Sequence, residues 1–506
     1  MKILIALQDF LRESLPRVFG CKEYNEEKEN LERIDNILIK SGLEVKFLQM
    51  SLMNWESKYN QVDGEKECVK KRKGEAARQS YLKQSSLALR CMILLLLTGN
   101  SFREMSKAIA KTPLYQGFCR IENLIYVKVP SKSLLQKFSY WLSEEQMREI
   151  NVELGMILGN KEKALDVGLE KELDMSSVWV DSTCLEANIH FPVDWVLLKD
   201  AARSILKSIQ VIRKHGLKHR MPDPVVLLAR VNALAMGISA GRRNPQKKKQ
   251  RNKMFRKLCE ICKVIEEHGK TYRKELDEKW EETDLSRKQA EARLKRIDKI
   301  IEQLPEARRQ AYERIIGKRP VASKDKKLSL YEEDVHVIVR GKAGARVEFG
   351  NTLFIAEGDE GFIVDYKLKR ESSNGDGKLL ISRMDEIITG CGGKLERITG
   401  DRGFATQEVG EVLKKAGVTN NLCPRSPADI KKRLEEDEVF KMDLTRRGQT
   451  EGRIGILKNK FLGGCPTWKG FKGREQAVSW AVLAHNLWVV ARKKWKVEKT
   501  SAKKAG

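Results

Sequence analysis

The pattern of apolar and polar positions is helical from residue 1 to about residue 165. Its most apolar stretch, 87–97, is interrupted by Arg90 and ends at a Thr-Gly-Asn-Ser break. Ser101 and Glu104 match a capping box, so we expect a new helix directly after this break. We therefore predict an all-helical N-terminal domain over 1–165, in which two helices across a short turn form either a helical hairpin or a helix-turn-helix.

The pattern changes at Val178-Trp179-Val180, a β-branched and aromatic run that indicates a buried strand. Asp181 follows directly, and a carboxylate within a strand is unfavourable unless it has a partner or a task. From about residue 195 to residue 327 the pattern is helical again. We expect this block to be a helical insertion within a larger folded domain.

Short runs rich in Val, Ile and Phe follow the insertion. Glycine-containing turns separate them, which predicts an antiparallel meander over 335–368. After the meander, the pattern alternates between helices and strands. We expect strands at 394–399 and 419–423 and helices at 379–390, 407–416, 446–462 and 476–494.

This order of elements predicts an α/β fold with a mixed sheet flanked by helices. We expect the sheet domain to be discontinuous, with residues 174–194 and 328–495 folding together around the helical insertion 195–327. Residues 496–506 form a basic tail.

Composition adds a strong positive charge. The chain has 97 Lys and Arg against 70 Asp and Glu, a formal net charge of +27 at pH 7. Such a surplus attracts polyanions, so nucleic acid is the expected partner, bound in a salt-dependent manner. Residues 241–257 hold nine basic side chains and no acidic one. We expect this segment to contact nucleic acid through Arg242, Arg243, Lys247, Lys248, Lys249 and Arg251.

Ten scattered cysteines are too sparse for a disulfide framework, which favours reduced thiols and a cytoplasmic protein. Cys259 and Cys262 form the one close pair, and without a second pair at a suitable spacing we expect them to pack rather than to bind zinc. No signal peptide is evident. The most apolar run, 92–97, is far shorter than the roughly 20 residues that span a bilayer, so we expect no membrane partner.

Asp181 and Asp401 are the carboxylates best placed for chemistry. Each lies at or near the end of a predicted strand, where open sheets tend to place functional groups. Carboxylate oxygens are suitable ligands for Mg²⁺. A pair of such ions stabilises the entering and leaving oxygens of phosphoryl transfer, so the two acids indicate that class of reaction.

A third acid, Glu451, lies on a predicted helix. Arg447, Glu451 and Lys458 are spaced by four and seven residues, so they share one face of that helix. A carboxylate between two cations suits a metal ion beside a phosphate, although a surface ion-pair ladder has the same spacing. A neighbouring apolar stripe is expected to bury the helix against the sheet, through Ile454, Leu457 and Phe461.

Three glycines lie on the same predicted helix, at positions 448, 452 and 455. Each costs about 1 kcal/mol relative to alanine in a helix interior. Their presence indicates that another group approaches the helix backbone closely.

Three segments resemble the acidic motifs of bacterial insertion-sequence DDE transposases. They are Trp179-Val-Asp-Ser-Thr183, Gly400-Asp-Arg-Gly-Phe404 and the run from Arg446 to Lys458. The meander between Asp334 and Asn351 and the segment Glu186-Ala-Asn-Ile-His-Phe-Pro192 are also similar to that family.

The resemblance covers roughly residues 80 to 495. A subgroup of the family carries a Tyr-x2-Arg-x3-Glu-x6-Lys signature. Arg447, Glu451 and Lys458 match it, whereas Leu444 stands at the tyrosine position.

The resemblance implies an RNase H-like fold and a DNA transposase that cleaves element ends and joins them to a target. Asp181, Asp401 and Glu451 would then be the catalytic metal ligands, with two Mg²⁺ ions, or Mn²⁺ in their place, in each active site. Arg447, Lys458 and Arg402 would contact DNA. The implied partners are double-stranded DNA, as element ends and as target, and further copies of the chain on that DNA. No small-molecule substrate is implied, and the location would be the bacterial cytoplasm at the nucleoid.

Two other functions fit the same residues. An RNase H-like endonuclease would cut DNA without joining it, and a catalytically inactive DNA-binding protein would need only the basic residues. Strand transfer distinguishes the transposase from both.

Overall fold

The structure, a computed structural model, describes residues 18–60, 74–121, 126–240, 245–322, 325–339, 347–372, 375–464 and 468–496. The predicted DNA contacts Arg242 and Arg243 and nearly all of the predicted basic tail lie outside these residues. The chain divides into two compact units. The first comprises Met1–Leu185, Thr352–Lys369 and Ser373–Gly506, and the second comprises Glu186–Asn351 and Arg370–Ser372.

Helices fill the described part of the chain before the first strand, as the pattern predicts. They are α2 (Lys22–Lys40), α3 (Leu43–Asn60), α4 (Glu75–Thr98), α5 (Phe102–Lys111), α6 (Pro113–Cys119), α7 (Lys132–Phe138), α8 (Glu144–Leu158) and α9 (Lys161–Val167). The capping box that precedes α5 is confirmed. The backbone N–H of Glu104 donates to the Ser101 hydroxyl, and the backbone N–H of Ser101 donates to the Glu104 carboxylate.

Helix α4 is a core helix of the first unit. Among the described helices it alone is long and apolar enough, by length and composition, to cross a membrane. However, 67% of its most apolar window is buried inside the protein, so α4 packs within the core of the first unit.

The sheet contains β1 (Ser177–Glu186), β2 (His336–Val339), β3 (Val347–Gly358), β4 (Ile363–Leu368), β5 (Arg397–Gly400) and β6 (Thr419–Leu422). Its order is β2-β3-β1-β5-β6, and β4 also pairs with β3. Strands β2, β3 and β4 form the predicted antiparallel meander. Strands β1, β5 and β6 pair in parallel, so the predicted α/β fold with a mixed sheet is confirmed.

The helices that follow the meander are α14 (Asp376–Ile381), α15 (Met384–Gly390), α16 (Gln407–Lys415), α17 (Pro427–Glu436), α18 (Glu438–Ile456) and α19 (Gly470–Ala491). The single helix predicted over 379–390 is wrong. Two short helices replace it, because Arg383 takes a non-helical conformation between them and pairs with the buried Asp365 of β4 at 2.7 and 2.9 Å. Helix α17 was not predicted.

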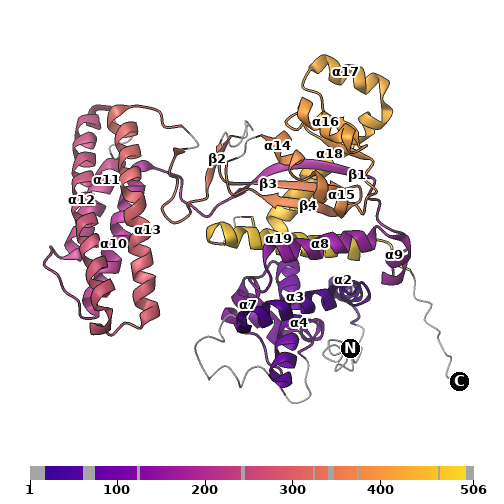
Figure 1. Ribbon diagram of the computed structural model, residues 1–506, viewed down its shortest axis with the longest axis horizontal. Helices are drawn as coiled ribbons and strands as arrows, with labels where there is room; N and C mark the ends of the chain where they lie inside the picture. The colour runs from indigo at the N-terminus through magenta and orange to yellow at the C-terminus, as the bar shows by residue number, and fades with distance from the viewer. Residues whose placement is uncertain are drawn as a thin grey trace. The chain divides into compact units, whose positions relative to one another are not determined.

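Helices α8 and α19 form a layer between the sheet and the N-terminal helices (Figure 1). The side chain of Asn486 on α19 is bonded to the edge of β4, where it accepts from the N–H of Ile363 and donates to the carbonyl of the same residue, each at 2.9 Å. One apolar cluster therefore continues from α2 and α4 through α19 to the strands.

His485, also on α19, makes the stability of this layer sensitive to acid. Burial, together with the nearby charges of Arg453 and Lys460, lowers the pKa of the imidazole to about 4, although a bond to Asn486 opposes the shift. The folded state therefore favours the neutral ring. Its stabilisation is complete above the unfolded pKa of about 6.5 and is lost as the pH falls from there towards 4.

We expect the free energy of unfolding to fall by about 3 kcal/mol across this window because of His485 alone, at about 1.4 kcal/mol per pKa unit. The measurement is urea unfolding of the wild type and of His485→Gln at pH 7 and at pH 4.5. Glutamine cannot take up the proton, so the variant should lose that share of the acid sensitivity. Equal losses in the two proteins would contradict the assignment.

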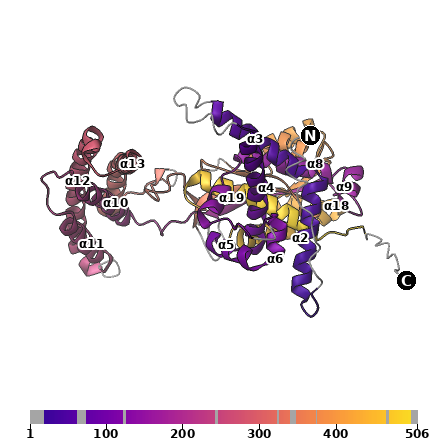
Figure 2. The same ribbon diagram turned by 90° about the horizontal axis from the view of Figure 1, so that it is seen from below.

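The second unit is built around four long helices that pack side by side (Figure 2). They are α10 (Asp194–Lys214), α11 (Pro224–Ala240), α12 (Lys248–Lys279) and α13 (Arg287–Tyr312). They share one apolar cluster, which includes Cys259 and Cys262. Burial raises the pKa of these two thiols to about 11 and about 12. Both cysteines thus pack in a core, as expected from their spacing.

Candidate functional site

The two strand carboxylates lie next to each other at the centre of the sheet. In the parallel pair β1 and β5, the last registered partners are Val180 and Gly400. Asp181 and Asp401 each follow that pair by one residue, so their side chains lie on the same face of the sheet. Asp401 comes directly after the last residue of β5, as predicted, whereas Asp181 is the fifth of the ten residues of β1, so the prediction that it lies at or near a strand end is wrong. Parallel strands are about 4.8 Å apart. The fold thus brings together two acids that are far apart in the sequence.

The pKa of Asp181 is raised to about 6. Burial is the largest cause, and the negative charges of Asp401 and Glu451 raise the pKa further. The backbone N–H of Ser182, which donates to Asp181 at 2.7 Å, and the charge of Arg447 act in the opposite direction. Asp401 and Glu451 therefore both lie close enough to Asp181 for their charges to act on it.

Two glycines beside Asp401 are required by close contacts. A Cβ added to Gly400 would lie 2.7 Å from Val180 Cγ2 on β1 and 2.9 Å from a methyl group of Leu422 on β6. A Cβ added to Gly403 would lie 2.9 Å from Asp401 Oδ1, which accepts the Gly403 N–H at 2.8 Å. The Gly-Asp-Arg-Gly segment therefore fits tightly around the Asp401 carboxylate.

Helix α18 carries the third acid and begins earlier than predicted. It starts at Glu438 and not at Arg446 as predicted. The Asp437 side chain caps the earlier start by accepting the N–H of Phe440 at 2.9 Å. The helix ends at Ile456 and continues as the π-helical turn η6 (Leu457–Phe461).

Asp443 anchors α18 to the sheet, a role that sequence reasoning missed. Its buried carboxylate accepts from the Asn421 amide on β6 at 2.9 Å and pairs with Arg397 on β5 at 3.2 Å. Its backbone carbonyl accepts the indole N–H of Trp179 on β1, also at 2.9 Å. Three strands thus fix the helix two turns before Glu451.

Glu451 itself is exposed. Its side chain is 58% accessible and pairs with Arg447 at 3.4 Å. Lys458 lies in the π-helical turn, so the prediction that one continuous α-helix carries all three residues is wrong for the lysine. The apolar stripe is confirmed, since Ile454, Leu457 and Phe461 are buried.

The three glycines of α18 present a bare face of the helix. No atom among the described residues lies within 4 Å of a Cβ added at Gly448, Gly452 or Gly455. The close approach expected from the sequence is therefore not made by the described part of this chain, and the face beside Glu451 is open to a partner.

A divalent cation fits the donor chemistry of this cluster. Asp181 and Asp401 supply hard oxygen ligands side by side, and their mutual repulsion favours a bound cation. Within the described parts of the chain, no three His, Cys, Asp or Glu side chains are already gathered around one point that could hold a metal. Glu451 is not gathered with the two aspartates, because its side chain forms an ion pair with Arg447.

The predicted DNA-contacting residues fall into two groups. Arg402 is exposed directly after Asp401, and Arg447 and Lys458 are half-buried on α18 and η6. In the second unit, Lys247 belongs to the 3-10 turn η2 (Pro245–Lys247) and is exposed. Three more basic residues open α12, namely Lys248, Lys249 and Arg251.

The basic start of α12 crowds like charges together. The neighbouring Lys318, followed by Arg251, lowers the pKa of Lys248. Such crowding is unfavourable for the free protein and would be relieved by a polyanion.

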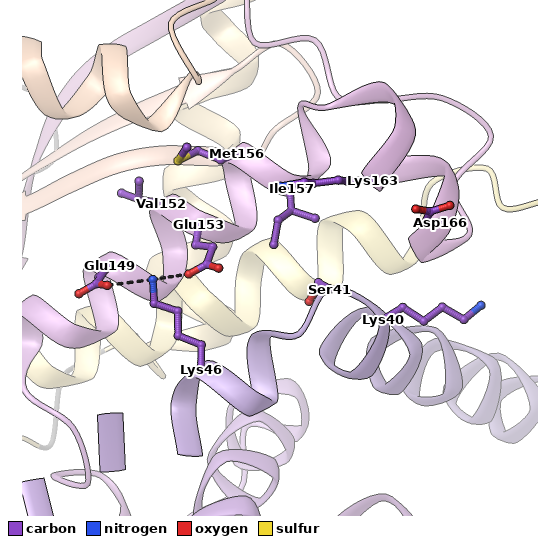
Figure 3. Close-up of a pocket in the computed structure, with 10 residues that line it drawn as sticks. All are labelled: Lys40, Ser41, Lys46, Glu149, Val152, Glu153, Met156, Ile157, Lys163 and Asp166. Carbon is purple, nitrogen blue, oxygen red and sulfur yellow. Dashed lines mark ion pairs between the residues drawn. The ribbon is translucent and has the colours of Figure 1, made fainter. Parts of the chain in front are cut away.

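A cavity of about 580 Å³ lies elsewhere in the first unit, where α8 and α9 face the α2–α3 corner (Figure 3). Lys46 points between Glu149 and Glu153 and forms ion pairs with both, at 2.8 Å to Glu149. None of the three predicted acids lines it. Its lining carries three lysines and three acids, so it has no net charge, and we place the candidate site beside Asp181 and Asp401 instead.

Comparison of the chain with protein-family models, curated proteins and solved structures gives no match. The functional argument therefore rests on the residues and on their geometry.

Proposed function

We propose that this protein is a DDE-type DNA transposase with an RNase H-like core. It binds the terminal repeats of its insertion element as double-stranded DNA, cleaves them and joins them to a target. The observation that carries the proposal is the placement of Asp181 and Asp401 on adjacent parallel strands, with Glu451 close enough to raise the pKa of Asp181.

Three acids of the first unit would hold two Mg²⁺ ions, or Mn²⁺ in their place. When bound, the ions would supply stabilisation of the entering and leaving oxygens in phosphoryl transfer. Asp181 and Asp401 already lie side by side. Glu451 would exchange its pair with Arg447 for a cation at little cost, since exposed ion pairs contribute only about 0–1 kcal/mol.

The basic residues would bind the DNA backbone. Arg447, once released from Glu451, together with Lys458 and Arg402, would hold phosphates beside the acids. The bare glycine face of α18 leaves room for the backbone of DNA to approach the helix. The crowded cations at the start of α12 would add sequence-independent affinity. We propose that the protein acts as a homo-oligomer on paired ends in the bacterial cytoplasm.

Strand transfer tests the proposal. Purified protein is incubated with Mg²⁺, a plasmid that carries its gene with the flanking DNA, and a second target plasmid. We expect products in which an element end is covalently joined to the target, and none when EDTA removes the metal. Cut ends without joining would instead identify an endonuclease. Salt-dependent binding without metal-dependent cleavage would identify a DNA-binding protein, and either result would overturn the proposal.

A further inference from the structure

A fourth carboxylate, which sequence reasoning missed, lies beside the strand acids. Asp376 is the first residue of α14, between β4 and β5 in the sequence. It is half-buried, and its Oδ1 accepts the hydroxyl hydrogen of Ser182 at 2.8 Å. Ser182 follows Asp181 on β1, so a residue of α14 is bonded to the strand that carries the first acid.

The other oxygen of Asp376 lies near the second acid, Asp401. A Cβ added to Gly403 would lie 2.9 Å from Asp376 Oδ2 and equally 2.9 Å from Asp401 Oδ1, so these two oxygens lie within twice that distance of each other. The same carboxylate is therefore bonded to the middle of β1 and lies near Asp401, which follows β5.

We propose that Asp376 is a positioning residue of the divalent-cation site, and that it acts through Ser182. This inference rests on the proposed function. The backbone N–H of Ser182 donates to Asp181 Oδ1 at 2.7 Å, while the hydroxyl of Ser182 donates to Asp376. Ser182 thus connects the two carboxylates, and the position of its backbone sets where the Asp181 oxygen lies.

The effect of this connection is on cation binding. Asp181 needs a fixed orientation to share a cation with Asp401, because like charges side by side otherwise turn away from each other. Partners that orient metal ligands typically change metal affinity by about 10–100-fold when they are removed. The alternative role for Asp376 is purely local, as an acid in the first turn of α14 that stabilises the helix start.

A double-mutant cycle on Mn²⁺ affinity separates these roles. The variants are Asp376→Ala, Ser182→Ala and the double variant, with Mn²⁺ binding to the full-length protein followed by electron paramagnetic resonance in the absence of DNA. We expect each single variant to bind Mn²⁺ about 10-fold more weakly, and the double variant to be no weaker than the weaker single one. Additive losses would mean that the two residues act independently and would overturn the proposal.

Two further variants sharpen the cycle. Asp376→Asn keeps an oxygen that accepts the Ser182 hydroxyl, so its affinity should stay within about 3-fold of the wild type. A loss as large as that of Asp376→Ala would show that charge matters instead of the hydrogen bond, against the proposal. Asp385→Ala, an exposed aspartate in the first turn of α15, is the matched control and should bind Mn²⁺ normally.

The outcomes also separate this inference from the proposed function. Wild-type protein that binds no Mn²⁺ would overturn the metal-dependent function and the role of Asp376 with it. Wild-type binding that is unchanged in Asp376→Ala and Ser182→Ala, with both variants folded by circular dichroism, would overturn only the role of Asp376.

Discussion

Asp401→Asn is expected to lower Mg²⁺-dependent DNA cleavage by about 1000-fold or more, equivalent to about 4 kcal/mol of lost transition-state stabilisation. The amide keeps an oxygen that accepts the Gly403 N–H, so the fit of the surrounding loop is preserved. What it removes is the negative charge beside Asp181. The measurement is the rate of nicking of end-bearing DNA under single-turnover conditions.

Binding of the same DNA should survive in Asp401→Asn. The cations assigned to the phosphates are untouched, and removal of a carboxylate reduces repulsion of the DNA backbone. Asp385→Asn, an exposed aspartate outside the cluster, serves as the control and should cleave at the normal rate. Normal cleavage by Asp401→Asn would remove this residue from the catalytic set and leave the proposed triad without support.

The strands of the candidate site were predictable from local sequence, and their adjacency was not. Val178-Trp179-Val180 shows the β-branched and aromatic pattern of a buried strand, and both strands form near the expected positions, although β1 continues past Asp181 to Glu186 and β5 starts at Arg397 instead of residue 394. The parallel register of Val180 with Gly400 depends on long-range pairing that no local pattern encodes. The sequence predicted that the two acids act together at one metal site, but only the fold shows the strand pairing that makes them neighbours.

The positioning residues were missed for a related reason. Asp376 lies in a polar stretch of the sequence and Asp443 between Met442 and Leu444, and nothing in their spacing distinguishes them from exposed acids. Asp443 becomes important because Arg397 and Asn421 arrive from two other strands. Helical spacing did place Arg447 beside Glu451, but it could not foresee the π-helical turn that takes Lys458 out of the α-helix.

Arg90 interrupts the most apolar stretch of the sequence, and its role could be recognised only from the packing of the folded protein. In the structure its side chain is fully buried in α4. Its guanidinium donates to Glu44 at 2.7 and 3.0 Å and to the Phe118 carbonyl at 2.9 Å, and it pairs with Asp35 at 2.6 Å. Arg90, which interrupts an apolar helix in the sequence, is thus the centre of a buried ion-pair cluster.

Glu44→Ala is expected to lower the free energy of unfolding of the first unit by about 3–5 kcal/mol. Removing one partner of a buried ion pair leaves the other charge uncompensated in the core, and that cost is much larger than the net value of the pair. Here the deletion would leave both Arg90 and the nearby Arg120 with only Asp35 to balance them. The measurement is urea unfolding followed by circular dichroism at pH 7.

The matched control is Glu29→Ala on α2, whose carboxylate pairs with Arg33 but is 58% exposed. An exposed pair of this kind contributes about 0–1 kcal/mol, so the control should unfold almost as the wild type does. Glu44→Gln should fall between the two, because the amide keeps one acceptor for Arg90 but not the charge. If Glu44→Ala loses no more stability than Glu29→Ala, the cluster is not buried as the structure has it, and the packing of α4 against α3 that depends on it is wrong.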